Sequence, residues 1–322
     1  HNTFSNWAFQ ISLLCKKSVS KQGVFDRIGK AAVAFSKQLL QEVVRKQITQ
    51  NYASTLFEKF NAVLLQDSTT LALPQLLSKI FKGNHSHCVQ KAVARIQSVF
   101  NIKTMTFNYF SLGSFTENDQ SASSLILPLL KEGDLVIRDM GYFVLSTFKE
   151  IIDAKAHFLS RLKYGVVISD EAGKIITLKE LLKHKNGIDK WVYIGVKNKV
   201  KVRLVMLPLP SAQVAEKIRK AKADRDARLN HSKEYYLWLR YNVYVTSVGN
   251  EVWDTADVGK AYKVRWQIEI IFKSWKSGFN LQDVLHDGCT KVERVKVIIY
   301  LMLVFICLSL IHISEPTRQA EI

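Results

Sequence analysis

Two short apolar runs that each lead into an aspartate constrain the fold of this chain more than any other feature. The first run, Ala62 to Leu65, is followed within two residues by Asp67, and the second, Leu135 to Ile137, is followed within two residues by Asp139. A compact apolar run that stops at polar residues is typical of a buried strand. We therefore predict that Asp67 and Asp139 lie at the ends of two core strands.

Further strand-like segments recur through the middle of the chain. The β-branched and aromatic residues between Ala92 and Ser111 indicate a hairpin that follows the first strand. After the second aspartate, segments rich in Val and Ile are closed by prolines and predict a β-rich insertion over residues 165–248. The segments expected to form strands after Asp139 are 157–162, 166–169, 191–197, 201–207 and 241–248.

Helical periodicity appears on both sides of these strands. Apolar residues recur at helical spacing between Ser18 and Gln50, and shorter helical patterns cover 121–130, 148–152 and 216–228. Strands enclosed by helices predict an α/β fold with flanking helices. The expected division is a truncated N-terminal helical segment (1–55), a first core part (56–164), the β-rich insertion (165–248), a second core part (249–306) and a non-native tail (307–322).

The charge of the chain favours an anionic partner. The 46 Lys and Arg residues exceed the 28 Asp and Glu residues and give a formal net charge of +18. Such a surplus attracts polyanions, and it favours nucleic acid over an anionic membrane, the other partner that selects for basic residues. The four cysteines have no paired spacing, which indicates a reducing compartment and a cytoplasmic location.

The end of the chain carries its only candidate for a membrane span. The apolar run from Val297 to Ile313 is near the lower limit of about 17 residues for crossing a bilayer, so we interpret it as a buried helix and expect no membrane contact. The residues from Cys307 onward resemble a translated sequencing adapter and are expected to be foreign to the protein. The chain opens at His1 without an initiator Met, and we expect a segment upstream of it to be missing.

A helix expected from Val258 to Ser277 presents a stripe of polar residues. Asp254 and Asp257 precede or begin it and are expected to cap it. At about 100° per residue, the spacings of three, four and seven place the stripe within roughly 60° of the helix surface. The stripe consists of Tyr262, Arg265, Glu269 and Lys276.

The stripe alone has an ordinary explanation. Arg265 and Glu269 are four residues apart and could form a surface ion pair worth a few tenths of a kcal/mol. Asp67 and Asp139 could likewise be turn residues after their strands. Together, however, three carboxylates are what an enzyme needs to hold two divalent metal ions about 4 Å apart for chemistry at a phosphodiester.

Three segments resemble motifs of one protein family. The stripe follows the order Tyr, two residues, Arg, three residues, Glu, six residues, Lys, which resembles the signature of the insertion-sequence-four family of bacterial transposases. The segments QDSTTLALP around Asp67 and GDLVIRDMGYF around Asp139 are similar to the two aspartate motifs of the same family and stand in the same order. The resemblance covers about Ser18 to Asp287.

The resemblance implies a ribonuclease-H-like core and a DNA transposase that uses two divalent ions, Mg²⁺ with Mn²⁺ as a substitute. It implies that Asp67, Asp139 and Glu269 are the catalytic metal ligands. It also implies cut-and-paste movement of double-stranded DNA through a hairpin intermediate, and a homodimer during transposition. DNA contacts would come from Tyr262, Arg265 and Lys276, and from Trp238 or Tyr241 stacked on a flipped base, although these two aromatics are equally suited to the core.

Two other functions remain open at this stage. A truncated, inactive remnant would bind DNA with a steep salt dependence and would not cut it in Mg²⁺ or Mn²⁺. A membrane-attached protein would insert the run from Val297 to Ile313 into lipid or detergent. We rank the transposase first and the membrane protein last.

Overall fold

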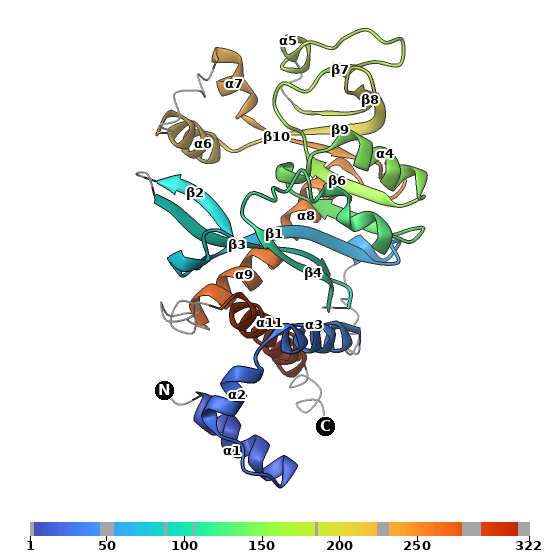
Figure 1. The fold of residues 1–322 in the computed structure, drawn as a ribbon. Helices are drawn as coiled ribbons and strands as arrows, with labels where there is room; N and C mark the ends of the chain where they lie inside the picture. Colours follow the sequence, from blue (N-terminus) through green and yellow to red (C-terminus); the bar gives the residue numbers. More distant parts are fainter. Residues whose placement is uncertain are drawn as a thin grey trace.

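The computed structural model describes residues 3–45, 55–86, 89–104, 106–183, 186–223, 232–278 and 291–314. Its elements form a mixed α/β fold, in which α1 (Thr3–Cys15) and α2 (Lys21–Arg27) lie at the end of the molecule away from β7 (Ile168–Ser169) and β8 (Ile188–Ile194) (Figure 1). The strands are β1 (Val63–Leu73), β2 (Lys82–Ser86), β3 (Val89–Asn101), β4 (Thr106–Ser114), β5 (Leu135–Arg138), β6 (His157–Arg161), β7 (Ile168–Ser169), β8 (Ile188–Ile194), β9 (Val200–Pro208) and β10 (Tyr241–Thr246).

Helices precede, interrupt and follow the strands. The α-helices are α1 (Thr3–Cys15), α2 (Lys21–Arg27), α3 (Lys30–Arg45), α4 (Leu145–Asp153), α5 (Leu178–Leu181), α6 (Ser211–Ala223), α7 (Lys233–Trp238), α8 (Thr255–Lys263), α9 (Trp266–Gly278) and α11 (Val292–Ser314). Short 3₁₀ helices are η1 (Thr55–Phe57), η2 (Gln75–Leu77), η3 (Ser123–Leu129) and η4 (Met140–Tyr142).

The described strands form one sheet in the order β2-β3-β1-β5-β6-β10-β9-β8-β7, with β4 also paired to β3. Its centre is parallel, because β5 pairs with both β1 and β6 in parallel register. The hairpin predicted after the first strand is confirmed as the antiparallel pair β3 and β4. Strands β7 to β10, which cover much of the segment expected to be β-rich, continue the same sheet beyond β6 through antiparallel pairs.

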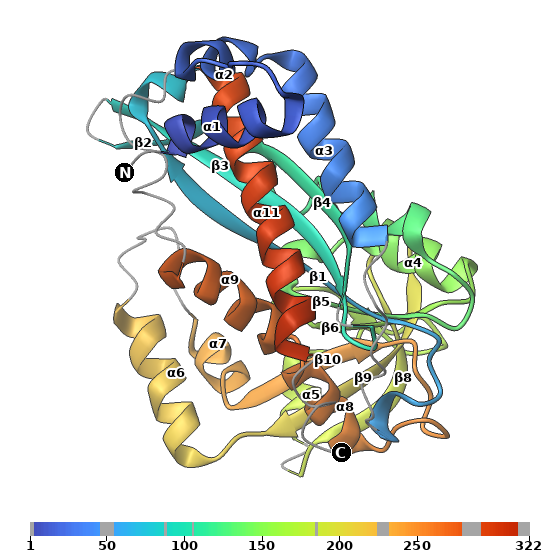
Figure 2. The same cartoon turned by 90° about the horizontal axis from the view of Figure 1, so that it is seen from below.

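Helices cover the two faces of the sheet unequally. On one face, α3, α8, α9 and α11 lie over β1, β3, β5 and β6, and α3 and α11 pack against each other (Figure 2). On the other face, α4 and η3 cover the central and outer strands. Alternate residues of each central strand enter the two cores, as shown by Leu65 on the first face and Leu64 on the second.

Two of the sequence predictions are wrong in detail. Asp67 does not end its strand, since β1 continues to Leu73 through antiparallel pairing with β3. The helix expected from Val258 to Ser277 is instead two helices, α8 and α9, separated by a turn at Val264 and Arg265. There the backbone N–H groups of Val264 and Arg265 bond to oxygens three residues back, which tightens the chain into a single turn of 3₁₀ type.

The C-terminal apolar run forms most of α11, which packs its Val295, Ile299 and Leu303 into the core beneath the sheet. Within the described part of the chain, we find no helix that is both long enough and apolar enough to cross a membrane. Of the segment expected to be foreign, residues up to Ser314 continue α11 and the remainder lies outside the described residues.

Candidate active site

Asp67 and Asp139 lie side by side because of the register of β1 and β5. These strands pair in parallel up to Gln66 and Arg138, the residues that immediately precede the two aspartates. Side chains two residues apart share a face of a sheet. Since Leu65 and Ile137 belong to the core beneath α8 and α9, both aspartates face these helices.

The opposite wall of the site comes from the α8–α9 junction. Asp254 caps the start of α8, as expected, by accepting a hydrogen bond of 2.7 Å from the backbone N–H of Asp257. Tyr262 lies in the last turn of α8, Arg265 in the junction, and Glu269 in the first turn of α9. The change of direction at the junction does not separate the three side chains, which all reach toward β1 and β5.

One guanidinium group contacts all three carboxylates. Arg265 Nη1 lies 3.2 Å from Asp67 Oδ2, Nη2 lies 2.6 Å from Glu269 Oε1, and Nε lies 4.0 Å from Asp139 Oδ1. The Tyr262 hydroxyl also donates to Asp139 Oδ1 over 3.3 Å. The Arg265 side chain is only 9% exposed, so its contact with Glu269 is not the solvated surface pair that helix spacing alone would allow.

Burial and repulsion shift the charges of this cluster. Burial raises the pKa of Asp67 to about 6, with smaller increases from the charges of Asp139 and Glu269 and opposing effects of the Ser68 backbone N–H and Arg265. The pKa of Arg265 is raised by Tyr262 and the three carboxylates, although burial opposes this. The site therefore holds more negative charge than its single arginine balances.

This donor set fits a divalent cation in chemistry and charge. Carboxylate oxygens are preferred ligands of Mg²⁺ and Mn²⁺, and a divalent ion would relieve the repulsion that raises the pKa of Asp67. As the side chains stand, however, no three His, Cys, Asp or Glu residues in the described ranges form a group arranged to hold an ion. The Arg265 guanidinium lies among the carboxylates instead.

Residues 58–310 match the family model described as "Transposase DDE domain". The chain belongs to this transposase family. Domains of this family generally use divalent metal ions. The matched range includes Asp67, Asp139 and Glu269, together with Tyr262, Arg265 and Lys276.

Several relatives carry transposase names. The chain is 30% identical over 316 residues to the transposase of insertion sequence element IS231F from Bacillus thuringiensis subsp. israelensis, a match that covers 90% of this chain and 65% of the relative. It is 28% identical to that of IS231B from B. thuringiensis subsp. berliner, with the same coverage, and 26% identical to that of IS1151 from Clostridium perfringens, covering 95% of this chain and 68% of the relative. The chain thus spans about 65% of the length of its IS231 relatives.

A solved structure titled as a piggyBac transposase synaptic complex with hairpin DNA also resembles this chain, with a TM-score of 0.44 and 9% sequence identity. The match covers 82% of this chain and 49% of that chain.

The other residues predicted to contact DNA are Lys276, Trp238 and Tyr241. Lys276 belongs to α9, but its side chain lies outside the described residues. Trp238 ends α7 and is half-buried, with its ring 5.9 Å from that of Tyr164. Tyr241, at the start of β10, is also half-buried, and both aromatics pack against the core cluster on the face of the sheet opposite α8. Neither aromatic contacts the three carboxylates, all of which lie in the described part of the chain.

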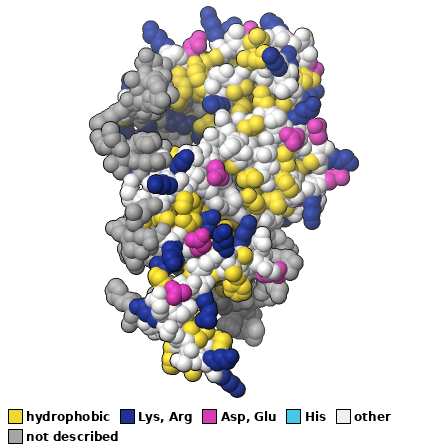
Figure 3. Space-filling model, in the orientation of Figure 1, with side chains coloured by type: hydrophobic (Ala, Val, Ile, Leu, Met, Phe, Trp, Pro, Cys, Tyr) yellow, Lys and Arg dark blue, Asp and Glu magenta, His cyan; other side chains and the backbone are white. Residues whose placement is uncertain are grey.

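Basic side chains flank the site on the β10 side. The ammonium group of Lys217, on α6, donates to Asn242 Oδ1 over 2.8 Å. Burial and the charge of Arg161 lower the pKa of Lys217 to about 8, and the same arginine acts on Tyr262. On the face shown in Figure 3, the described Lys and Arg side chains are spread along the length of the molecule and are not gathered in one patch.

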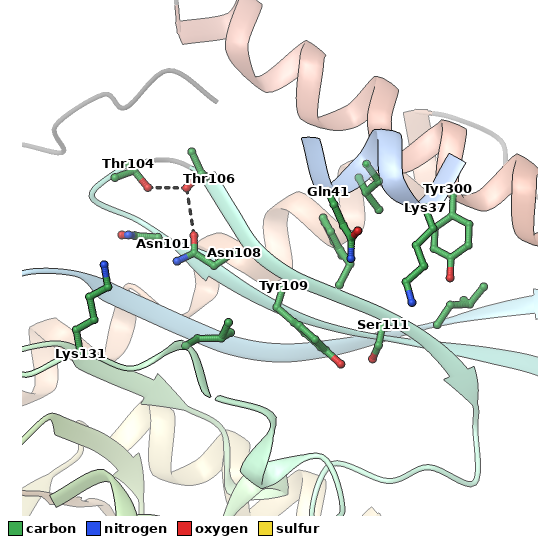
Figure 4. Close-up of a pocket in the computed structure, with 14 residues that line it drawn as sticks. Lys37, Gln41, Asn101, Thr104, Thr106, Asn108, Tyr109, Ser111, Lys131 and Tyr300 are labelled. Atoms are coloured by element: carbon green, nitrogen blue, oxygen red, sulfur yellow. Dashed lines mark hydrogen bonds between the residues drawn. The ribbon is translucent and has the colours of Figure 1, made fainter. Parts of the chain in front are cut away.

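One cavity is separate from this cluster. It has a volume of about 990 Å³ and lies between β4 and the helices α3 and α11 (Figure 4). Lys37, Tyr109 and Tyr300 point into it, while the three carboxylates do not line it.

Sequence reasoning missed a set of polar side chains directly behind the aspartates. Asp119, in the segment between β4 and η3, accepts hydrogen bonds from Ser68, Arg95 and Gln97. Nothing in its local sequence, a polar stretch typical of a surface loop, distinguishes it. Only the folded sheet brings these residues together.

Proposed function

We propose that this chain is a DNA transposase that carries out metal-dependent phosphodiester cleavage and strand transfer, with Asp67, Asp139 and Glu269 as its catalytic residues. The observation that carries the proposal is the contact of one arginine with all three carboxylates. These residues are separated by long stretches of sequence, yet β1, β5 and α9 bring them to one point. Membership of the transposase family supports the assignment of these carboxylates as the catalytic residues.

Asp67, Asp139 and Glu269 would hold two divalent ions, Mg²⁺ in the cell with Mn²⁺ as a substitute. Bound ions would polarise the phosphodiester and activate water or a 3′-hydroxyl for attack. Burial raises the pKa of Asp67 to about 6, and a cation bound beside it would favour its charged form. No covalent enzyme intermediate is needed, because the attacking oxygen comes from water or DNA.

Arg265, Tyr262 and Lys276 would bind DNA phosphates next to the scissile bond. The guanidinium of Arg265 is buried beside the carboxylates. Its paired N–H donors would bind phosphate oxygens of the DNA in place of the carboxylate oxygens. Lys217 and the neighbouring basic residues of α6 add positive charge on the β10 side of the site. Double-stranded DNA, as transposon end and as target, is therefore the proposed substrate.

The order β4-β3-β1-β5-β6, antiparallel and then parallel, supports a ribonuclease-H-like core. We place the β-rich insertion at residues 165–248, where β7 to β10 extend the sheet. Trp238 or Tyr241 would stack on a flipped base in a hairpin intermediate. The acting form would be a homodimer located in the cytoplasm.

A truncated, inactive DNA-binding remnant is the second candidate. It is favoured by one observation, that the carboxylates of the described site surround an arginine and do not form a three-ligand group. Such a protein would bind DNA with a steep salt dependence and would cleave nothing in Mg²⁺ or Mn²⁺.

Cleavage of DNA by the purified chain tests both candidates. Wild type should nick DNA in Mg²⁺ or Mn²⁺, and Asp139→Asn should lose about 100-fold or more, since metal ligation is worth several kcal/mol in the transition state. Asp153→Asn, an exposed aspartate at the end of α4, is the matched control and should retain activity. Metal-dependent nicking that survives in Asp139→Asn would refute the assignment, and binding without nicking by wild type would favour the remnant.

A further inference from the structure

Behind the two aspartates, on the face of the sheet opposite Arg265, lies a group of polar side chains that we call the Asp119 cluster. Alternation along β1 turns Ser68 away from Asp67 and toward this face. On β3, Gln97 pairs with Ser68 and Arg95 pairs with Thr70, so both lie beside it. The Asp119 cluster consists of Ser68, Arg95, Gln97, Asp119 and Tyr142.

A single carboxylate oxygen organises the cluster. Asp119 Oδ1 accepts hydrogen bonds from Arg95 Nη1 at 2.7 Å, from Ser68 Oγ at 2.8 Å and from Gln97 Nε2 at 3.1 Å. The Asp119 side chain is 26% exposed and that of Arg95 12% exposed, so solvent screens this ion pair only in part. Asp119 therefore ties a segment outside the sheet to both β1 and β3.

The same carboxylate supports the turn that follows Asp139. A Cβ atom at Gly141 would lie 2.8 Å from Asp119 Oδ2 and 3.1 Å from Asp119 Cβ, so a side chain at this position would have to displace Asp119. The next residue, Tyr142, is fully buried and donates its hydroxyl to Gln97 Oε1. Burial, with the charges of Asp119 and Asp67, raises the pKa of Tyr142 and keeps it protonated as a donor.

Each catalytic aspartate is thus one or two residues from a contact of Asp119. On the β1 side, Ser68 donates its backbone N–H to Asp67 Oδ1 over 2.8 Å while its hydroxyl binds Asp119. On the β5 side, Gly141 packs on Asp119 two residues after Asp139. Pairing of β1 with β5 stops at Gln66 and Arg138, so this ladder does not hold Asp139, whereas Asp67 is still paired with Ser98 on β3.

We infer that Asp119 is a positioning residue that sets the spacing between Asp67 and Asp139 and thereby the affinity of the site for divalent metal. The inference rests on the proposed function, in which these aspartates are metal ligands. Asp119 would touch neither metal nor DNA. It acts through Ser68 on one aspartate and through the Gly141–Tyr142 turn on the other, as outer residues commonly orient the ligands of a metal site.

Binding of Mn²⁺ to the full chain without DNA, measured by titration below the unfolding temperature of every variant, tests this inference. Asp119→Ala should weaken Mn²⁺ binding about 10-fold or more, in the range found for outer residues of metal sites. Gly141→Ala should weaken it as well, because the new methyl group displaces Asp119 without removing a hydrogen-bonding group. Asp119→Asn should bind nearly as wild type, since its amide oxygen can accept the same three hydrogen bonds.

Controls separate positioning from stability and from the proposed function. Val192→Ala removes buried volume from β8, far along the sheet, and should lower the unfolding temperature without changing Mn²⁺ affinity. Wild-type affinity in folded Asp119→Ala and Gly141→Ala would overturn the inference and leave the proposed function intact. Mn²⁺ binding that is unaffected by Asp139→Asn would overturn both, because the ion would then lie elsewhere.

Discussion

Arg265 Nη1 donates a hydrogen bond of 3.2 Å to Asp67 Oδ2, joining the α8–α9 junction to the middle of β1. The arginine also contacts Glu269 and Asp139, so it acts as the resident cation of the site. The three carboxylates therefore all lie around Arg265 even without a metal ion. The effect of the Arg265 charge on Asp67 can be measured as a shift in the pKa of Asp67.

Removal of Arg265 should raise the pKa of Asp67 above its value of about 6. The arginine charge lowers this pKa, whereas burial and the other two carboxylates raise it. Loss of an opposite charge at this distance is expected to shift the pKa by about 1 unit or more. NMR titration of the carboxyl carbons in wild type and Arg265→Ala measures the shift, and an unchanged Asp67 would mean that the two charges do not interact in solution.

Asp67→Asn should stabilise the fold at neutral pH. The pKa of about 6 for folded Asp67 lies above the ordinary aspartate value of 3.8, so folding favours the protonated form. The stabilisation of the fold by the protonated Asp67 carboxyl is fully present below about pH 4 and is lost as pH rises through 6. At pH 7.5 the buried charge costs about 3 kcal/mol, of which Asn should recover about 1. Urea unfolding at pH 7.5 and 4.5 provides the check. The gain should shrink at the lower pH, and a larger gain there would contradict the sign.

The ion pair between Arg203 and Asp189 should be important for stability. Arg203 is fully buried and binds Asp189 through Nε at 2.7 Å and Nη2 at 2.6 Å, while Nη1 donates to the Trp253 carbonyl just before α8. Arg203→Ala should therefore cost about 3–5 kcal/mol of unfolding free energy, because it leaves a half-buried carboxylate unpaired. Lys201→Ala is the matched control.

Lys201 lies on the same strand and pairs with Glu171, but both side chains are at least half exposed. Its removal should leave the unfolding free energy nearly unchanged, because solvent screens this pair. Equal effects of the two substitutions in urea unfolding would show that burial does not set the strength of these pairs.

Comparing Tyr262→Phe with Tyr262→Ala should distinguish the contribution of the hydroxyl to stability from that of the ring. The hydroxyl donates to Asp139 Oδ1 at 3.3 Å, while the buried ring packs 5.1 Å from that of Tyr244. Loss of the hydroxyl alone should cost about 1 kcal/mol of stability, and Tyr262→Ala should cost about 3–5 kcal/mol through the cavity it leaves. Denaturant unfolding of both variants gives the comparison, and similar losses would indicate that the ring contributes little.

Sequence patterns located the starts of the central strands but not the full length of β1. The apolar run up to Leu65 reflects burial on both faces, and beyond Asp67 the buried positions alternate because only one face stays covered. The polar residues Ser68 to Thr70 looked like a loop in isolation. Their strand is stabilised by pairing with β3, a non-local interaction that no local window contains.

The sequence predicted the acidic residues that lie around Arg265, but not the geometry that brings them together. Its other candidates, Trp238 and Tyr241, pack on the opposite face of the sheet. The spacing from Tyr262 to Glu269 identified the side chains, although the expected continuous helix breaks at Val264 and Arg265 without a glycine or proline to signal it. The Asp119 cluster could not be found from sequence, because its members lie in separate elements and share no motif. Register and packing, which place them together, arise only in the folded chain.

A crystal of the full chain soaked in Mn²⁺, with an anomalous difference map, tests the central claim most directly. We predict manganese peaks ligated by carboxylate oxygens of Asp67, Asp139 and Glu269, with the Arg265 guanidinium displaced from its present contacts. Manganese bound elsewhere, or carboxylates that keep Arg265 at saturating Mn²⁺, would contradict the assignment of these three residues as the metal ligands of a transposase.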